Sequence, residues 1–143
     1  MDITQFGIPK GEQRYPEQII HTLALLYNVI NTDLSHFLKS YDLSMGKWNI
    51  LIAIKHHGGD TGIRQVEISE HLIVTPSNMT KMLDKLQADG LVQRVALPGD
   101  RRVNLVRITR KGSQLLDRIW EPYVQQLTSA VGSLNRDQQR QLG

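Results

Sequence analysis

Two short helical segments separated by three residues constrain the fold of this chain most strongly. The first runs from Ile63 to Leu72, where apolar and polar residues alternate as on a short amphipathic helix. The second begins at Thr75-Pro76, because threonine is a favoured N-cap and proline suits the first helical position. It continues to about Ala88, where Asp89-Gly90 ends it. The spacing predicts a helix-turn-helix.

Two extended runs follow these segments. They span Leu91 to Ala96 and Val103 to Thr109, and the residues between them, 97–102, contain the turn signal Pro98-Gly99-Asp100. We therefore expect a β-hairpin whose loop carries Arg101 and Arg102 at its tip. A hairpin directly after a helix-turn-helix is typical of a β-wing.

Helical periodicity also covers the chain on both sides of this unit. It predicts a helix of about 25 residues from Tyr15 to Ser40, one capped by Ser44, a long one from Arg110 to Val131, and a last one capped by Asn135. Pro122 predicts a kink in the long helix. The expected fold is mainly α with a small β-hairpin wing. The first helix is apolar over more of its girth than one core face needs, which indicates a second buried side against a partner.

The length and the amino-acid composition of the chain exclude several classes of protein. The chain has 143 residues and no cysteine, so a disulfide framework, a thiolate metal site and a cysteine nucleophile are excluded. No run approaches the length of a membrane span and the N-terminus has no basic signal-peptide region, so we expect a cytoplasmic protein with no membrane partner. The end at Gly143, one short turn into a helix, indicates that the native chain extends further.

The positive charge is concentrated in the middle of the chain. The net charge is +3, and residues 61–112 hold nine Lys and Arg against five Asp and Glu, whereas the rest of the chain holds eight against nine. A localised excess of this kind is typical of a surface that binds a polyanion, although a solvated surface with chance clustering also explains it.

The second helix of the motif has one apolar and one polar face. Met79, Met82, Leu83 and Leu86 recur at helical spacing and face inward, which leaves four polar side chains on the other face: Ser77, Asn78, Lys81 and Lys85. Asparagine can read adenine, serine can bond to base edges or phosphate, and lysine can reach guanine or phosphate. This face is suited to a DNA major groove, although an ordinary exposed helix face would look similar.

The predicted wing adds a second DNA-binding element. Arginine side chains are attracted to the narrow minor groove of A·T-rich DNA, which suits Arg101 and Arg102. Asp100 beside them is expected to pair with a neighbouring guanidinium and fix the conformation of the tip. The alternative is a solvated turn with an incidental ion pair.

These segments together resemble one known family. The stretch "RQVEISEHLIVTPSNMTKMLDKLQADGLVQR" resembles the helix-turn-helix and first wing strand of the multiple-antibiotic-resistance regulator (MarR) family. Asp100-x-Arg102 followed by Val106-x-Ile108-Thr109-x-x-Gly112 resembles its wing signature. The resemblance implies a single MarR-type chain over 1–143, with a winged-helix DNA-binding lobe at 44–112 and dimerisation helices at 12–40 and 111–143.

The function that the resemblance implies is sequence-specific regulation of transcription. A homodimer would bind a palindromic operator in duplex DNA, with repression as the family's commoner mode. By the same resemblance Ser77, Asn78, Thr80 and Lys81 would face the major groove, Thr75 and Pro76 the DNA backbone, and Arg102 with Arg101 the minor groove. Two positions depart from the family pattern. Arg64 stands where Ser or Thr often caps the first helix, so either the helix start shifts or Arg64 contacts phosphate, and Ile73 stands at a turn position that often holds Gly.

The resemblance further implies a small phenolic or anionic aromatic effector, and no cofactor. The candidate lining residues are His21, Tyr27, Trp48 and Tyr123, although for Trp48 and Tyr27 a place in the core is the simpler interpretation. Two other functions stay open: a winged helix that docks proteins without binding DNA, and a histidine-based metal sensor. The second is disfavoured because none of the five histidines forms a pair at metal-ligand spacing. The sequence contains no nucleophile motif and no phosphate-binding glycine loop, so we do not expect an enzyme.

Overall fold

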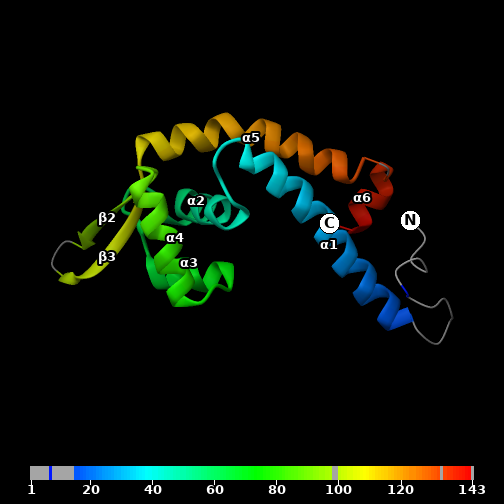
Figure 1. Cartoon of the computed structure of the whole chain (residues 1–143), viewed down its shortest axis with the longest axis horizontal. Coiled ribbons are helices and arrows are strands. Elements are labelled where there is room, and N and C mark those ends of the chain that lie inside the picture. The colour runs from blue at the N-terminus through cyan, green and yellow to red at the C-terminus, as the bar shows by residue number, and fades with distance from the viewer. Residues whose placement is uncertain (1–6, 8–14, 98–99, 133, 143) are drawn as a thin grey trace.

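Six helices and three short strands make up the described part of the chain. A computed structural model describes residues 7, 15–97, 100–132 and 134–142, and for residues 97, 100–104 and 142 it describes the backbone alone. The elements are α1 (Tyr15–Lys39), α2 (Met45–Gly58), β1 (Ile63–Arg64), α3 (Gln65–Leu72), α4 (Pro76–Ala88), β2 (Val92–Leu97), β3 (Asp100–Ile108), α5 (Arg110–Ala130) and α6 (Arg136–Leu142). Helices α2 to α4 and the strands form a lobe, from which α1 and α5 extend to the far end, where α6 lies (Figure 1). None of the helices in the described ranges is long and apolar enough to cross a membrane.

Helix α2 lies at the centre of the lobe. Ser44 begins it as predicted, because its side-chain oxygen accepts a hydrogen bond from the backbone N–H of Lys47. Helix α2 is buried on several sides, as expected for a helix surrounded by other elements. The core around it draws on every helix from α1 to α5, with the following fully buried side chains among its members: Leu38, Trp48, Ile50, Leu51, Ile54, Ile68, Met79, Leu83, Leu86, Val106 and Ile119.

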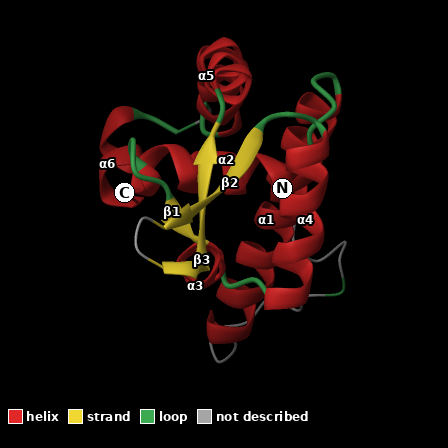
Figure 2. Cartoon of the chain, turned by 90° about the vertical axis from the view of Figure 1, so that its left-hand side faces the viewer, coloured by secondary structure: helices red, strands yellow, loops and turns green. Residues whose placement is uncertain are grey.

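The strands form one antiparallel sheet in the order β1-β3-β2. Figure 2 shows β3 between its two neighbours and running directly into the start of α5. Strand β1 was not predicted: Ile63 and Arg64 pair with Val106 and Leu105 instead of starting the helix. Ile63 is buried in this pairing, and α3 therefore begins at Gln65.

The hairpin of β2 and β3, which we call the wing, has a shorter loop than predicted. The expected loop covered 97–102, but β2 continues to Leu97 and β3 begins at Asp100. The pairing shifts register between Ala96, which faces Asn104, and Leu97, which faces Asp100. Arg101 and Arg102 therefore belong to the start of β3 and not to the loop.

Gly112 fixes the junction between the wing and α5. Thr109 caps α5 by accepting a hydrogen bond from the Gly112 N–H, and its hydroxyl lies 2.7 Å from the Gly90 carbonyl oxygen. A Cβ atom at position 112 would lie 2.2 Å from the Leu91 carbonyl oxygen, which no side chain can accommodate without movement of the backbone. The glycine of the wing signature is therefore required by the close approach of α5 to the start of β2.

The turn between α3 and α4 adopts a conformation unfavourable for its residue. Ile73 has a φ of 53° and a ψ of 46°, in the left-handed region, and its backbone N–H bonds to the Glu70 carbonyl. A β-branched side chain in this region costs about 1–2 kcal/mol. The side chain is 96% exposed, so it gains no burial that would offset this cost.

We expect Ile73→Gly to raise the free energy of unfolding by about 0.5–1 kcal/mol, because it removes the left-handed strain while glycine's freedom in the unfolded chain offsets part of the gain. Urea denaturation at one fixed protein concentration measures the change. The matched control is Val66→Gly, also exposed but inside α3, which should lower stability by about 1 kcal/mol. A lower urea midpoint for Ile73→Gly than for the unaltered chain would contradict the inference that Ile73 is strained.

Candidate nucleic-acid interface

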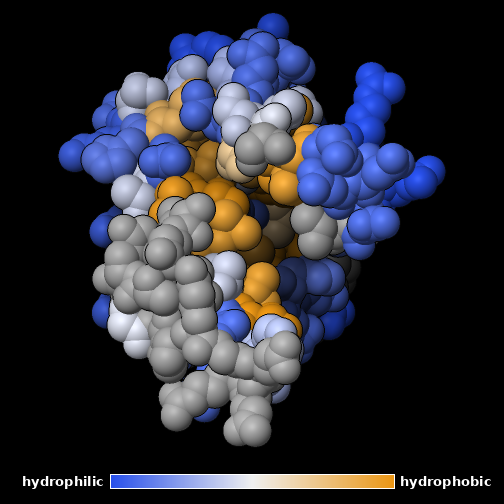
Figure 3. All heavy atoms as spheres, turned by 90° about the vertical axis from the view of Figure 1, so that its right-hand side faces the viewer, coloured by the Kyte–Doolittle hydropathy of each residue, from blue (hydrophilic) through white to orange (hydrophobic). Residues whose placement is uncertain are grey.

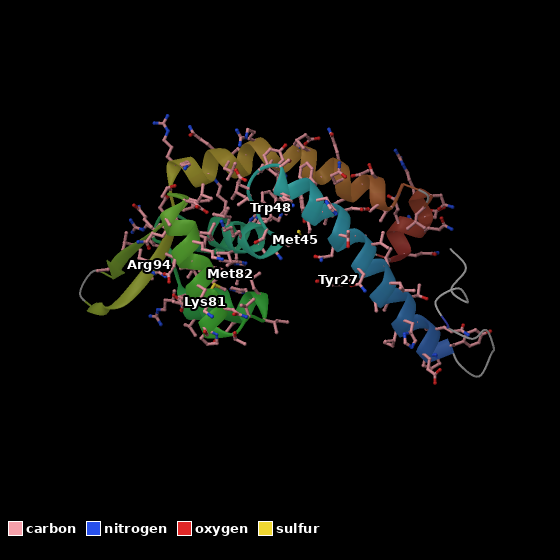
Figure 4. All side chains as sticks on the ribbon, viewed as in Figure 1. Tyr27, Met45, Trp48, Lys81, Met82 and Arg94 are labelled. Carbon is pink, nitrogen blue, oxygen red and sulfur yellow. The ribbon has the colours of Figure 1, made fainter. Side chains whose placement is uncertain are left out.

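Helix α4 presents a polar ridge on the surface of the lobe. Pro76 occupies its first position, and Met79, Leu83 and Leu86 are buried against the core. All four side chains that helical spacing placed on the polar face are exposed on the remaining surface of this helix: Ser77, Asn78, Lys81 and Lys85. Figure 4 shows Lys81 on α4 at the edge of the lobe that is away from α5. The helix therefore has the two-sided character that insertion into a groove requires.

The N-terminal end of α4 is suited to an anion. Thr75 has the extended backbone of an N-cap residue, but its side chain makes no capping hydrogen bond. In the part of the chain that the structure describes, no side chain caps the first-turn N–H groups of α4. Such N–H groups, with the positive end of the helix dipole, favour a phosphate oxygen. Thr75 and Pro76 are both exposed here.

Thr80 differs from the other predicted contact residues. Its hydroxyl lies 3.0 Å from the Pro76 carbonyl oxygen and accepts a hydrogen bond from Gln65 Nε2 at 2.7 Å. The single hydroxyl proton is therefore used within the protein. This side chain is exposed, but its arrangement joins α4 to the start of α3, a role that helical spacing alone does not reveal.

Arg64 extends the polar surface beside α4. Arg64 keeps the N-cap position that the family pattern gives it, because α3 begins directly after it, and the Glu67 carboxylate accepts a hydrogen bond from the Arg64 backbone N–H at 2.9 Å. Glu67 thus provides its half of a capping box, although the Arg64 side chain makes no capping hydrogen bond. The exposed guanidinium makes no hydrogen bond or ion pair within the described residues, which leaves its donors available to a phosphate.

The wing side chains Asp100, Arg101 and Arg102 lie outside the part of the chain whose side chains are described. Their backbone belongs to β3. Minor-groove insertion by the arginines and pairing by Asp100 therefore stay predictions.

Two histidines come together that sequence spacing did not pair. The rings of His57, at the end of α2, and His71, at the end of α3, stack with centroids 4.2 Å apart and planes 9° apart. Among the described residues no group of three or more His, Asp or Glu side chains is placed to hold a metal ion. The stacking of His57 on His71 depends on how α2 packs against α3, and the spacing of residues along a single helix does not reveal it.

An aromatic cluster lies between α2 and α5. The ring centroid of buried Trp48 is 4.8 Å from that of Tyr123 and 6.4 Å from that of Trp120. A cavity of about 340 Å³ adjoins the cluster, lined by Ile52, Lys55, His56, Leu116, Asp117 and Trp120. The buried Trp48 Nε1 finds no acceptor among the described residues.

The other two residues predicted to bind an effector lie elsewhere. His21 and Tyr27 are exposed on α1, with Tyr27 67% accessible. Figure 4 shows Tyr27 about halfway along α1 and Trp48 within the lobe. The structure therefore brings together Trp48 and Tyr123 but not all four residues.

One face of α1 is apolar and uncovered. Its exposed side chains, which we call the α1 apolar face, are Ile19, Ile20, Leu23, Leu26 and Tyr27. Leu127 and Val131, at the end of α5 and just beyond it, are also more than one-third exposed. Figure 3 views this end of the molecule and shows apolar atoms gathered around a hollow with hydrophilic atoms at its rim.

Comparison with known proteins places these features in one family. A sequence model of the MarR family matches residues 43–103. The transcriptional regulator PecS of Dickeya dadantii is 26% identical over 127 residues, which cover 89% of this chain and 76% of PecS. The transcriptional repressor IacR of Pseudomonas putida is 35% identical over 99 residues, covering 69% and 58%.

Solved structures share the fold over most of their length. A mutant MarR from E. coli, complexed with operator DNA, aligns with a TM-score of 0.80 and 22% identity, covering 93% of this chain and 94% of that one. The regulator BldR from Sulfolobus solfataricus aligns with a TM-score of 0.75 and 27% identity, covering 89% of each. The winged-helix fold predicted from the sequence is confirmed.

We expect Thr80→Val to lower the free energy of unfolding by about 0.5–1.5 kcal/mol, because a nearly isosteric side chain loses the bond to Gln65. Chemical denaturation checks this. Ser77→Ala is the control, since the Ser77 hydroxyl makes no bond within the described chain, and its stability should stay level or rise by up to about 0.5 kcal/mol. Equal losses in both variants would show that the Gln65–Thr80 contact contributes nothing particular.

Proposed function

Because this chain belongs to the MarR family of winged-helix regulators, we propose that it binds a palindromic operator in duplex DNA as a homodimer and represses transcription until a small aromatic or anionic ligand releases it. The lobe at 44–112 binds the DNA, and the segments at 12–40 and 111–143 form the dimer. The observation that carries this proposal is the ridge of α4, which is buried on one side and exposes Ser77, Asn78, Lys81 and Lys85 on the other, next to an uncapped helix start.

The roles of the residues follow from their chemistry. Ser77, Asn78 and Lys81 reach base edges or phosphates in the major groove, with Lys85 one turn beyond Lys81. Thr75, Pro76 and Arg64 border the helix start, where the phosphate backbone passes. Arg101 and Arg102 enter the adjacent minor groove from the wing.

The α1 apolar face supports the homodimer. Its large exposed side chains lie along one side of a 25-residue helix, and a soluble protein rarely leaves such a row in water. A second copy with the same face, related by a twofold axis, buries both at once. A palindromic operator then matches the symmetry of the protein.

The cavity beside Trp48 supports the effector. Its lining combines the aromatic ring of Trp120 with the side chains of Lys55, His56 and Asp117. The ring of Trp120 lies 6.4 Å from that of Trp48, whose buried indole N–H has no acceptor among the described residues. These features suit an aromatic ring that carries a carboxylate or phenolate. Addition of a panel of aromatic acids to an operator-binding assay tests this, and no change in affinity with any acid would count against it.

Replacing both wing arginines, Arg101→Ala with Arg102→Ala, should weaken binding to duplex DNA and flatten the dependence of log affinity on log salt by about one to two units, because fewer phosphate counterions are released. Fluorescence anisotropy over a salt series measures both. The control removes two cations from α6, Arg136→Ala with Arg140→Ala, and should leave the slope unchanged. Unchanged affinity in the wing variant would favour a protein-docking module.

Leu23→Glu should convert the dimer into a monomer, because a carboxylate in an apolar interface loses its hydration without a partner. Sedimentation velocity measures the change. Asn28→Glu is the control: it lies on the opposite side of α1 and introduces the same charge, so it should leave the dimer intact. A monomeric unaltered chain, or a Leu23→Glu variant that stays dimeric, would contradict the proposed interface.

A further inference from the structure

Arg94 connects the wing to α4 through two hydrogen bonds. It lies on β2, where it pairs with Val106 of β3. Its Nη1 donates to Gln87 Oε1 at 2.8 Å and its Nη2 donates to Asp84 Oδ1 at 2.7 Å. Figure 4 shows Arg94 on the wing side of α4. One planar guanidinium thus holds two residues that lie one turn apart on the helix.

This contact contributes little to the stability of the fold. The side chains of Arg94 and Asp84 are 26% and 58% exposed, so water screens the ion pair. Leu86 of α4 and Val92 of β2 are both buried in the same core cluster, which already holds the helix and the strand in the lobe. We call the two hydrogen bonds of Arg94 to Asp84 and Gln87 the fork. The fork affects the angle at which the wing leaves α4 more than it affects the folding of the lobe.

The position of Asp84 on α4 is unusual for a groove-binding helix. Ser77, Lys81 and Asp84 are spaced at i, i+4 and i+7, so they lie along one line on the exposed face. A carboxylate on that line repels phosphate groups unless a cation neutralises it. Arg94 supplies that cation from the wing, and its own guanidinium is then less available to DNA.

We propose that Arg94 is a positioning residue which fixes the wing relative to α4, with Asp84 and Gln87 as its anchors, so that one lobe engages the major groove and the adjacent minor groove together. This inference rests on the proposed function, since it concerns how the two DNA-binding elements act as one. A wing without the fork still folds, but it loses its fixed direction and must be ordered, at an entropic cost, when it enters the groove.

A direct contact between Arg94 and phosphate would give a different pattern. In that case Asp84 competes with DNA for the guanidinium, and its removal strengthens binding. In the positioning role Asp84 assists binding although its own charge opposes DNA. Replacement of Asp84 therefore changes affinity in opposite directions under the two accounts.

The test uses the full chain and a duplex operator recovered by selection from random sequences. Four variants are compared with the unaltered chain: Asp84→Ala, Asp84→Glu, Arg94→Lys and Asp89→Ala. The Asp89→Ala control removes an equal charge just after α4, where Asp89 pairs with Lys47 at 2.6 Å and not with the wing. Affinity, hydroxyl-radical protection of the minor groove, guanine methylation interference in the major groove, and the midpoint of thermal unfolding are measured for each.

We expect Asp84→Ala to bind the operator about tenfold more weakly, which is the size of effect that residues in direct contact have on one another. The variant should lose protection of the minor groove, whereas methylation interference in the major groove and the midpoint of thermal unfolding should stay as in the unaltered chain. Arg94→Lys should behave similarly, because an ammonium keeps the charge but not the fork. Asp84→Glu restores binding, since its carboxylate still reaches Arg94. Asp89→Ala binds as tightly as the unaltered chain or more tightly.

If Asp84→Ala binds DNA more tightly and still protects the minor groove, the positioning role of Arg94 is overturned but the proposed function is not. Loss of protection in both grooves with a lower thermal midpoint also overturns it, because the fork is then a structural contact. An unaltered chain that protects neither groove overturns the proposed function and the inference with it.

Discussion

The burial of one side of α4 is the constraint on which the rest of the structure depends. Met79, Leu83 and Leu86 pack onto the core around α2, and this fixes the rotation of α4 about its own axis. A rotation by one residue in either direction would expose apolar side chains and bury a charged one, Lys85 or Asp84, at a cost of several kcal/mol. The polar ridge faces outward because the apolar side of α4 can be buried only against the core around α2. Packing thus determines which side chains DNA can meet.

The same core sets the place of the wing. Val92 and Val106 are buried in the sheet, and Gly112 lets α5 approach the backbone at Leu91 so closely that the wing, α4 and α5 meet at one junction. The wing and α5 are therefore in backbone contact at this junction. The proposed ligand near α2 and α5, and the proposed dimer built on α1 and α5, would both act on the helix that begins there.

The helices were predictable because their signals are local. Pro76 at the first position of α4 and the caps Ser44 and Asn135 act within a single turn, so the sequence alone locates them. Strand β1 was missed because two residues have no periodicity and its partner, β3, lies far along the chain. The hairpin loop was predicted too long because Pro98-Gly99-Asp100 is a turn signal and two charged residues follow it, whereas β3 already begins at Asp100.

The candidate site was predicted as a set of exposed residues but not as a set of contacts. Lys81 and Ser77 followed from helical spacing, since the buried side of α4 was visible in the sequence. The bonds of Thr80 with Gln65 and of Arg94 with Asp84 join different elements, so only the packed structure reveals them. The stacking of His57 on His71 has the same origin.

Selection of bound sequences from a pool of random duplex DNA tests the central claim most directly. Two α4 ridges related by a twofold axis predict enrichment of an inverted repeat whose half-site centres lie about one helical turn apart, roughly 10 base pairs. Recovery of a single unsymmetrical site, or of sequences no different from the starting pool, would contradict the account.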